Sequence, residues 1–387
     1  MTSAPADPVD LPFLARLLEA DDDTHPRALL RKARAVSTAL PQLLLSAARR
    51  DGLALGTGAA DELRRAGERA DTYREVFAAV CADVSSATVR QVKGASLAAH
   101  YPEGLRRPVG DLDLVVDGDE EDLWRVVAAV TAYADLTDVD LALLHDGSRT
   151  HLVLSLSWPS PDALLDRDLR VEVSTLAFPG RHPDVPPRAR LPEEPFVADL
   201  LSLAEEAFQR PFHARDVVDV LFLFGAPPED SGRPDPSAVA AAAGTLRLAP
   251  ELLHLLTYSR DRVPPGVLGR LTAARLDAVT AALRGPVATE RARRAAVVSD
   301  RPADCLGIDD RLASGLPVHG MPLRHRPFDA GLSPSRRHDF ADGSLLRTPV
   351  ADFLLVTGPL VAPEQYHSAL RELDRIDPPA PGEPGSS

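Results

Sequence analysis

Lysine, cysteine and long apolar runs are scarce in this chain of 387 residues. Lys32 and Lys93 are the only lysines among 43 basic residues, so a lysine beside a glycine is more informative here than usual. No apolar run reaches the roughly 18 residues that a transmembrane helix needs, and we expect no membrane association. The first residues, MTSAPADPVDLPF, lack the basic and apolar regions of a secretory signal, which predicts a cytoplasmic protein.

The two cysteines, Cys81 and Cys305, have neither the CxxC spacing of a metal site nor the density of a disulfide scaffold. Basic residues are outnumbered by 57 acidic ones, and the formal net charge is -14. Such a chain repels the nucleic-acid backbone, so a long RNA or DNA partner is not expected. A nucleotide carried with Mg²⁺ is compatible with this charge, because the metal bridges an acidic protein and an acidic ligand.

The chain is longer than one typical core, and its hydrophobic content of 44% is that of an ordinary globular protein. The pattern of apolar residues predicts an α+β fold, with a small mixed sheet between helical segments and a C-terminal α/β-like appendage. We expect an N-terminal helical segment, a sheet-bearing core, a helical domain, the appendage and a disordered tail, over residues 1–84, 85–194, 195–290, 291–376 and 377–387.

Short segments of strand-like pattern predict four strands in the core, over residues 87–92, 111–116, 151–158 and 169–176. Helices are predicted directly after Gly94 and over residues 119–134, where acidic residues fill the first turn. Residues 300–350 carry many Pro, Gly, Arg and His without clear periodicity. A strand over 352–361 and a helix over 363–376 are predicted after them.

The main chemical candidates lie in VKGASLAAHYPEGLRRPVGDLDLVV, residues 92–116. Asp111 and Asp113 are two apart in a predicted strand and project to one face, while Leu112 and Leu114 project to the other. Two such close carboxylates repel each other unless a divalent cation lies between them, and these hard ligands suit Mg²⁺ or Mn²⁺. The alternative is a solvated face, because acidic residues are ordinarily exposed.

A third carboxylate on a neighbouring strand would complete a site for two metal ions. One ion would activate an attacking hydroxyl and the other would carry a triphosphate. Glu172, between Val171 and Val173 in LRVEVSTL, is the best candidate. An acid in the middle of an apolar strand is costly unless it is exposed, paired or metal-bound.

Lys93 and Gly94 precede the short predicted helix. Gly94 would let the backbone approach a phosphate closely, and the first amides of the helix would point N–H groups at it. Lys93 or Arg107 could supply the compensating positive charge. A glycine before a helix is commonplace, so this hypothesis depends on its combination with the Asp pair.

These residues together resemble the uncharacterised nucleotidyltransferase family of the DNA polymerase β-like superfold, whose signature is LKG…yp…RpxGDiDlLV. The matching segments are Lys93-Gly94-Ala95, Tyr101-Pro102 and RPVGDLDL over residues 107–114. Helices precede and follow the signature, as in that family. The resemblance covers roughly residues 35–225 and is fairly specific over 92–116.

The resemblance implies that Gly94 and Ser96 contact a triphosphate, that Asp111 and Asp113 bind metal, and that Glu172 is the third carboxylate of a catalytic and metal-binding trio. The superfold generally has the Gly and the Ser adjacent, whereas one residue separates them here. Family members commonly have Asp in the strand that carries Glu172 in this chain.

A second match lies in FHARDVVDVLFLF, after the predicted sheet. Arg215 and Asp219 are four residues apart on a helix and share a face. In related nucleotidyltransferases a basic–Asp pair on this helix faces the cleft, which implies that Arg215 contacts the nucleotide. The alternative is a surface ion pair that stabilises the helix.

Two further groups of polar residues are candidates of a weaker kind. His145 and His151 lie near strand ends, where a histidine is more often structural or solvent-facing than catalytic. A local basic patch could hold phosphate or an acidic acceptor, or could simply be a solvated loop, and its members are Arg324, Arg326, Arg336 and Arg337.

The resemblance implies a metal-dependent enzyme that transfers a nucleoside monophosphate from an NTP, with ATP the expected one, to an acceptor. The sequence does not identify this acceptor, which is a small molecule, a peptide or a protein. A different hypothesis is a binding or partner protein that kept the fold and lost the reaction. A toxin of a toxin–antitoxin pair and a tailoring enzyme for a peptide or antibiotic differ from the first hypothesis only in the acceptor.

Overall fold

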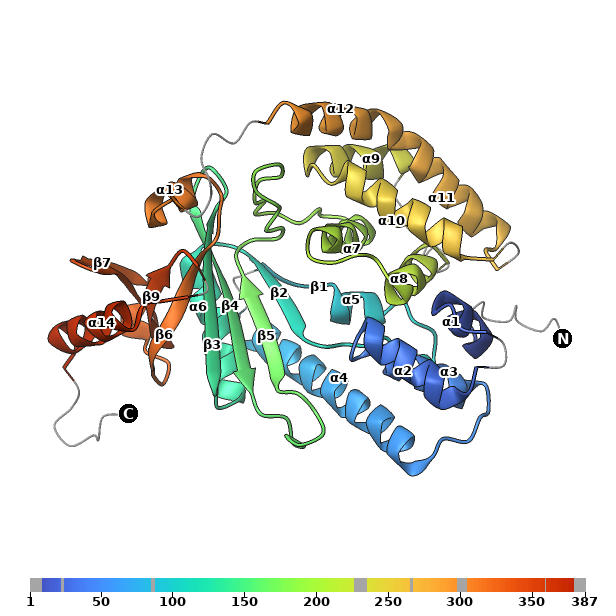
Figure 1. The fold of residues 1–387 in the computed structure, drawn as a ribbon, viewed down its shortest axis with the longest axis horizontal. Coiled ribbons are helices and arrows are strands. Elements are labelled where there is room, and N and C mark those ends of the chain that lie inside the picture. Colours follow the sequence, from blue (N-terminus) through green and yellow to red (C-terminus); the bar gives the residue numbers. More distant parts are fainter. Residues whose placement is uncertain are drawn as a thin grey trace. The chain divides into compact units, whose positions relative to one another are not determined.

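The computed structural model describes residues 9–21, 24–84, 88–225, 235–264, 267–297, 305–358 and 360–378. The predicted α+β class is confirmed, because these residues form fourteen α-helices and one mixed sheet of nine strands (Figure 1). Most of the predicted disordered tail, residues 379–387, lies outside the described residues. No described helix is both long enough and apolar enough to cross a membrane.

The chain divides into two compact units, each made of several segments. The first unit comprises Met1–Phe77, Gln91–Asp113 and Arg190–Val297. The second unit comprises Ala78–Arg90, Leu114–Ala189 and Val298–Ser387. The Lys-Gly turn and the Asp pair therefore belong to the first unit, and Glu172 belongs to the second.

The nine strands follow the order β1-β2-β5-β4-β3-β6-β9-β8-β7, and each neighbouring pair from β5 to β7 is antiparallel. Their bounds are Thr88–Val92 (β1), Leu112–Asp117 (β2), Asp138–His145 (β3), Thr150–Trp158 (β4), Leu169–Ser174 (β5), Val318–His325 (β6), Arg336–Phe340 (β7), Gly343–Arg347 (β8) and Ala351–Val356 (β9). The predictions for β1, β2, β4 and β5 are confirmed within two residues. The predicted strand over 352–361 is confirmed as β9, but it ends at Val356, five residues before the predicted end.

Four strands, β3, β6, β7 and β8, were not predicted. β7 has the sequence RRHDF, and β6 contains Gly320, Pro322 and an irregular register between Pro322 and Arg324. Such strands lack a clean period-two pattern, which explains why residues 300–350 showed no periodicity. β6 pairs with β3 in antiparallel orientation, and Leu141 faces Gly320 in this pair. Through this pairing the four strands β6, β7, β8 and β9 extend the sheet that the preceding strands form.

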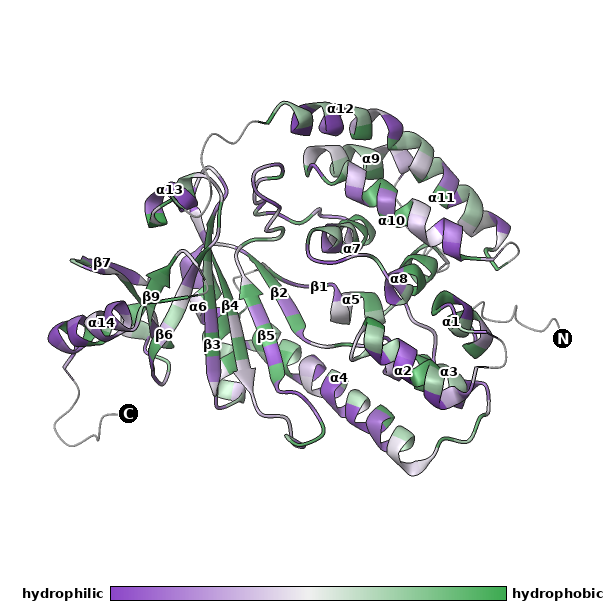
Figure 2. Ribbon diagram, in the orientation of Figure 1, coloured by the Kyte–Doolittle hydropathy of each residue, from purple (hydrophilic) through white to green (hydrophobic). Residues whose placement is uncertain are grey.

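One face of the sheet around β5 is apolar and the other is polar. Val171 and Val173 of β5 are fully buried, whereas Glu172 between them is half-buried. On β4 Leu154 pairs with Val173 and Ser155 pairs with Glu172, so each face continues across both strands. Alternating colours along β5 show this pattern (Figure 2). Helix α6 (Glu120–Tyr133), which begins with a capping box, packs against β5.

The N-terminal helices of the first unit share one apolar core with α8. Phe13 of α1, Leu43 of α3 and Val217 of α8 are fully buried in this core, and Leu29 on α2 adds to it. The bounds are Leu11–Leu17 (α1), Pro26–Val36 (α2), Leu40–Arg50 (α3), Gly94–Ala98 (α5), Pro195–Glu205 (α7), Glu206–Phe208 (η1) and Ala214–Gly225 (α8). Helix α4 (Thr57–Asp83) begins in the first unit and ends in the second.

Four more helices complete the first unit, and α10 contacts α7, α8, α9, α11 and α12. Their bounds are Pro236–Thr245 (α9), Ala249–Arg262 (α10), Arg270–Ala282 (α11) and Arg284–Ala295 (α12). In the second unit, α13 (Ile308–Ala313) precedes β6, and the 3₁₀ turn η3 (Ala330–Leu332) lies between β6 and β7. Helix α14 (Pro363–Ile376) places Ala369 and Leu373 on Leu345 of β8 and Leu354 of β9.

Gly320→Ala tests whether the C-terminal strands are part of one sheet. A Cβ atom at Gly320 would lie 2.8 Å from both Leu141 Cδ2 on β3 and Phe353 Cδ1 on β9. We expect this overpacking to lower the free energy of unfolding by about 1 to 3 kcal/mol in urea denaturation. Gly358→Ala, where a Cβ would meet nothing within 4 Å, is the control. Equal effects of the two substitutions would contradict the pairing of β3, β6 and β9.

Candidate functional site

The Lys-Gly turn packs directly against the segment that carries the Asp pair. An ideal Cβ on Gly94 would lie 3.3 Å from the backbone oxygen of Asp111 and 3.4 Å from Val109 Cγ1. A side chain there would push the two segments apart by a few tenths of an ångström. Glycine at this position therefore favours the close approach of the turn after β1 to the start of β2.

Lys93 adopts a backbone conformation that is rare for a residue with a side chain. Its φ is 57° and its ψ is -110°, at the position that precedes α5. Such a conformation costs about 1 to 3 kcal/mol and is found mostly at functional sites. Lys93 Nζ lies 3.4 Å from Glu206 Oε1, and Arg210 Nη2 lies 3.2 Å from Glu206 Oε2. One carboxylate thus holds two cationic side chains next to the turn.

Arg107 connects the turn to α8 through a buried ion pair. Its Nε and Nη2 donate to Asp219 Oδ1 and Oδ2 at 2.7 and 2.8 Å, and the side chains are 3% and 0% exposed. Tyr101 Oη donates to the same carboxylate at 2.7 Å. Arg107 Nη1 also donates to the carbonyl oxygen of Gly94 at 3.1 Å. The guanidinium therefore holds the turn and α8 in one arrangement.

The pKa values of this cluster reflect its burial and its charges. Burial disfavours the charged form of Arg107, but the charge of Asp219 and its hydrogen bonds outweigh this effect and raise the pKa of Arg107. Burial and the charge of Asp219 also raise the pKa of Tyr101 well above its ordinary value. These shifts favour a neutral Tyr101 that donates a hydrogen bond and a charged Arg107.

Asp111 and Asp113 are both half-buried, whereas Leu112 and Leu114 are fully buried, so burial alternates over residues 111–114 as predicted. The alternation ends there, because Val115 and Val116 are both buried. Within the described ranges the carboxylate of Asp111 has no hydrogen bond or ion pair. In that same part of the chain no three His, Cys, Asp or Glu side chains form a group that could hold a metal ion. Two carboxylates fit the chemistry of Mg²⁺, which usually takes one or two protein carboxylates together with phosphate oxygens and waters.

Glu172 lies on the polar face of β5 in the second unit. Its side chain is 33% exposed and its Oε2 is 3.9 Å from Arg170 Nη2. Ser155 lies opposite it on β4 and accepts a hydrogen bond from Arg170. Because Asp111 and Asp113 belong to the other unit, the part of Glu172 in the site stays a prediction.

Ser96, on α5, donates its hydroxyl proton to Asp199 Oδ1 of α7 at 2.6 Å. His100 Nε2 lies 3.4 Å from Asp199 Oδ2. Asp199 is buried, with 4% of its surface exposed. A hydroxyl has one proton to donate. The predicted contact between Ser96 and a triphosphate would therefore require this proton to turn away from Asp199.

Arg215 does not pair with Asp219, because Asp219 is buried and bound to Arg107. A surface ion pair between Arg215 and Asp219, the alternative interpretation of this helix, is thus wrong. Arg215 is half-buried, and its Nε is buried without a hydrogen bond to any residue of the described chain. Its predicted contact with a nucleotide stays a prediction.

Arg210 is a functional candidate that the sequence analysis did not identify. Its Nη1 and Nη2 donate to Asp216 Oδ2 and Oδ1 at 2.8 Å each, in addition to the contact with Glu206. Asp216 is fully buried and also accepts from the backbone N–H of His213 at 2.8 Å. Burial raises the pKa of Asp216, but the hydrogen bond from Arg210 and the positive charges around the carboxylate together outweigh it, and the net pKa is lowered. The Glu206–Arg210 spacing of four residues is the one signal in the sequence.

The other sequence candidates have structural contacts. His151 is fully buried, with Nε2 3.1 Å from Asp146 Oδ2 and Nδ1 3.1 Å from Thr175 Oγ1. His145 Nδ1 accepts from the backbone N–H of Gly147. The predicted basic patch is largely neutralised by carboxylates of the second unit, in the pairs Arg324–Asp374, Arg326–Asp352, Arg337–Asp309 and Arg337–Asp339.

Comparisons with known proteins give only distant likenesses. No protein-family model matches the sequence, and no curated protein matches it. The crystal structure of JHP933 from Helicobacter pylori is 16% identical, with a TM-score of 0.29 over 58% of this chain and 95% of that chain. A structure described as a "putative nucleotidyltransferase from H. pylori" is 14% identical, with a TM-score of 0.28 over 58% of this chain and 97% of that chain. Likenesses at these TM-scores do not establish an activity.

Asp219→Asn tests the buried ion pair. The substitution leaves the Arg107 charge buried without its counter-charge, and we expect the free energy of unfolding to fall by about 3 to 5 kcal/mol in urea denaturation. The control is Glu62→Gln, which breaks the exposed pair with Arg34 at 2.6 Å and should cost at most about 1 kcal/mol.

A combined variant separates lost charge from lost packing. Asp219→Leu with Arg107→Met and Tyr101→Phe removes every polar side chain of the cluster, so much of the lost stability should return. A combined variant less stable than Asp219→Asn would show that shape, and not unpaired charge, determines the effect.

His213 is expected to make the protein less stable in acid. Burial lowers its pKa to about 4, and its Nδ1, 3.4 Å from Asp216 Oδ2, has no hydrogen-bond partner among the described residues. The unfolded state, with a pKa near 6.5, gains protons that the folded state does not. The lowered pKa of His213 should therefore reduce the free energy of unfolding by about 3 kcal/mol between roughly pH 6.5 and pH 4.

His213→Gln should remove this component. Urea denaturation of both proteins at several pH values gives the difference between their stabilities. We expect that difference to change by about 3 kcal/mol over the interval and to be constant above about pH 7. A constant difference at all pH values would show that the pKa of His213 is not lowered by folding.

Proposed function

We propose that this protein is a metal-dependent nucleotidyltransferase that transfers a nucleoside monophosphate from an NTP, with ATP the expected donor, to an acceptor nucleophile. The contact between the Gly94 turn and the Asp111 backbone carries this proposal. It brings the two halves of the sequence signature, the Lys-Gly turn and the Asp-x-Asp pair, together in the first unit. Mg²⁺ or Mn²⁺ and the NTP are proposed ligands.

In the proposed reaction a nucleophilic atom of the acceptor attacks the α-phosphorus of the NTP. The bond from the acceptor to the α-phosphorus forms while the bond between that phosphorus and the bridging α–β oxygen breaks. Pyrophosphate leaves, and the proton of the acceptor passes to a base, for which Glu172 is the candidate. In this type of chemistry, positioning and charge stabilisation by the protein supply most of the catalysis.

Asp111 and Asp113 are the proposed metal ligands, with Glu172 as the third carboxylate. When bound, the metal ions neutralise the charge of the triphosphate and lower the pKa of the attacking group. Two half-buried carboxylates, one of them without a partner among the described residues, support this assignment, because such an arrangement gains stability from a cation. Glu172 acts either on the metal or as the base.

The triphosphate is assigned to the turn and the cations beside it. The backbone amides after Gly94 donate to phosphate oxygens, and Lys93 and Arg210 supply charge from the two sides of Glu206. Arg107 supports the turn through its bond to the Gly94 carbonyl, and any direct contact of Arg107 with the nucleotide would compete with Asp219. Ser96 and Arg215 are the remaining proposed nucleotide contacts.

A second candidate is a protein that binds a nucleotide or a partner protein and catalyses no nucleotidyl transfer. The engagement of Ser96 by Asp199 favours a protein that binds a partner, because the hydroxyl proton that would bind phosphate is already used. Glu172, where the family commonly has Asp, favours it as well. Binding without turnover distinguishes this candidate from an enzyme, whose acceptor is a small molecule, a peptide or a protein.

Asp113→Asn is expected to abolish both nucleotidyl transfer and Mg²⁺-dependent binding of the NTP. Its control is Asp117→Asn, on an exposed carboxylate at the end of the same strand, which should leave both unchanged. The assay incubates the protein with each of the four radiolabelled NTPs and Mg²⁺ or Mn²⁺. It follows pyrophosphate release and label on the protein or on added small molecules, while thermal denaturation with and without NTP reports binding.

The outcomes separate the candidates. Thermal stabilisation by an NTP and Mg²⁺, lost in Asp113→Asn, together with pyrophosphate release supports the enzyme. Stabilisation without pyrophosphate release from any NTP supports the binding protein. Stabilisation that Asp113→Asn retains would contradict the metal site. Glu172→Gln should keep NTP binding and lower the rate of transfer if Glu172 is the third carboxylate.

A further inference from the structure

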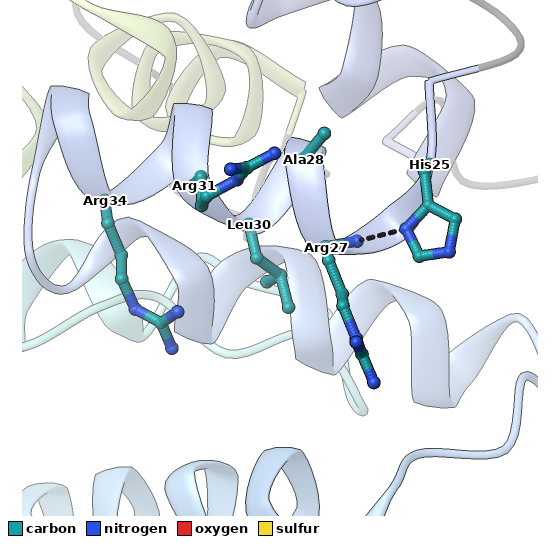
Figure 3. A pocket seen from close by; sticks show the side chains of 6 residues that line it. All are labelled: His25, Arg27, Ala28, Leu30, Arg31 and Arg34. Carbon is teal, nitrogen blue, oxygen red and sulfur yellow. Dashed lines mark hydrogen bonds between the residues drawn. The ribbon is translucent and has the colours of Figure 1, made fainter.

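Helix α2 presents a basic hollow on the surface of the first unit. The hollow has a volume of about 550 Å³, and its lining comprises His25, Arg27, Ala28, Leu30, Arg31 and Arg34 (Figure 3). Over its eleven residues α2 carries four cations and no acidic residue, although the whole chain has a net charge of -14. The surface around the hollow is therefore locally positive, although the protein as a whole is negatively charged.

The apolar side of α2 packs into the core of the first unit. This packing holds the helix in place, with its basic side at the surface. Leu29 and Ala33 are buried in the core that α2 shares with α8. In Figure 3 Arg27, Leu30 and Arg34 extend to the same side of α2, with Leu30 between the two arginines. Arg27 and Arg34 are seven residues apart, which is about 10 Å along a helix.

The lining offers hydrogen-bond donors, and only some of them bond to other described residues of the protein. Arg34 pairs with Glu62 at 2.6 Å, whereas the guanidinium groups of Arg27 and Arg31 have no hydrogen bond or ion pair within the described ranges. His25 Nδ1 accepts from the backbone N–H of Arg27 at 3.2 Å, so the neutral ring carries its proton on Nε2. The hollow therefore presents donors, with no carboxylate in its lining.

This free charge distinguishes Arg27 and Arg31 from three of the four arginines of the predicted basic patch. Only Arg336 of that patch has no carboxylate partner among the described residues, and it donates instead to the carbonyl oxygen of Gly331. Arg324, Arg326 and Arg337 each pair with at least one carboxylate, so their charge is largely neutralised. A guanidinium forms its strongest contacts with carboxylates, through two parallel hydrogen bonds. Arg27 and Arg31 are available for such contacts.

We propose that this α2 hollow, defined by the six lining residues, is a docking site for an acidic peptide segment of a protein partner. Carboxylates of the segment pair with Arg27 and Arg31, and its aliphatic side chains contact Leu30 and Ala28. Charge complementarity carries this assignment, since complementary charges speed association and select partners. The proposal is independent of nucleotidyl transfer.

The chemistry of the hollow favours a peptide over a nucleic acid. No Phe, Tyr or Trp lines it, and single-stranded nucleic acids bind mainly through bases stacked on such side chains, for which the exposed ring of His25 is a single substitute. Duplex binding requires contacts to many phosphates, but the hollow offers three arginines on a chain whose overall charge repels a long polyanion. A short acidic segment needs only the local positive charge, within the Debye length of about 8 Å at physiological salt.

The test measures binding of defined probes to the full chain by fluorescence anisotropy, without NTP or metal. The main probe is a fluorescein-labelled helical alanine-based peptide with Glu at positions i, i+4 and i+7, and its Gln counterpart is the uncharged control. Arg27→Glu with Arg31→Glu removes the docking charge. The matched control is Arg270→Glu with Arg291→Glu, on exposed positions of α11 and α12 in the same unit.

We expect the Glu peptide to bind, the Gln peptide not to bind, and the α2 double variant to weaken the Kd for the Glu peptide at least tenfold. The control variant, which has the same change in net charge, should bind like the wild type, and both variants should match the wild type in urea denaturation. No binding of the Glu peptide, or equal weakening in the two variants, would overturn the proposal. Tighter binding of oligo(dT) or of inorganic phosphate than of the Glu peptide, lost in the α2 variant, would overturn it in favour of a nucleic acid or a small anion.

Discussion

The buried ion pair between Arg107 and Asp219 fixes the part of the first unit in which the candidate site lies. Two charges removed from water are tolerated only when nearly all of their hydrogen-bonding groups are satisfied. Asp219 receives two bonds from Arg107 and one from Tyr101, and Arg107 donates its remaining bonds to backbone carbonyls, including that of Gly94. The segment between α5 and β2 is therefore tied to a helix more than one hundred residues later in the chain. The turn cannot shift without exposing or unpairing these charges.

A second buried aspartate on α8 repeats this arrangement one turn earlier. Asp216 holds Arg210, and Arg210 in turn shares Glu206 with Lys93. The cations beside the turn are thus positioned before any ligand arrives, which is the condition for electrostatic stabilisation at low cost. The strained backbone of Lys93 fits the same picture, because strain persists only where the surroundings determine it. Both features support a site for a polyanion with its cation, in agreement with the proposed NTP.

The distribution of charge gives the two proposals separate places in the first unit. The cations near the turn are held by buried or half-buried carboxylates and are suited to a ligand that brings its own metal. Arg27 and Arg31 on α2 have no such partners among the described residues and are suited to an acidic segment. In the second unit most of the corresponding arginines pair with nearby acids, so a basic sequence there does not give a basic surface. The sequence patterns of the two regions look alike, and only the contacts distinguish them.

The sequence by itself determined the α+β class, the helix over residues 119–134, and the strands around Asp113 and Glu172, because local alternation of apolar residues dictates which face of a strand is buried. It also determined the glycine turn, since glycine accommodates that close approach best. The tertiary structure alone decided that Asp219 pairs with Arg107 and not with its helical neighbour Arg215. It alone decided that β6 to β9 join the sheet. Spacing along a chain limits only local contacts, whereas these pairings depend on which buried groups satisfy one another across more than one hundred residues.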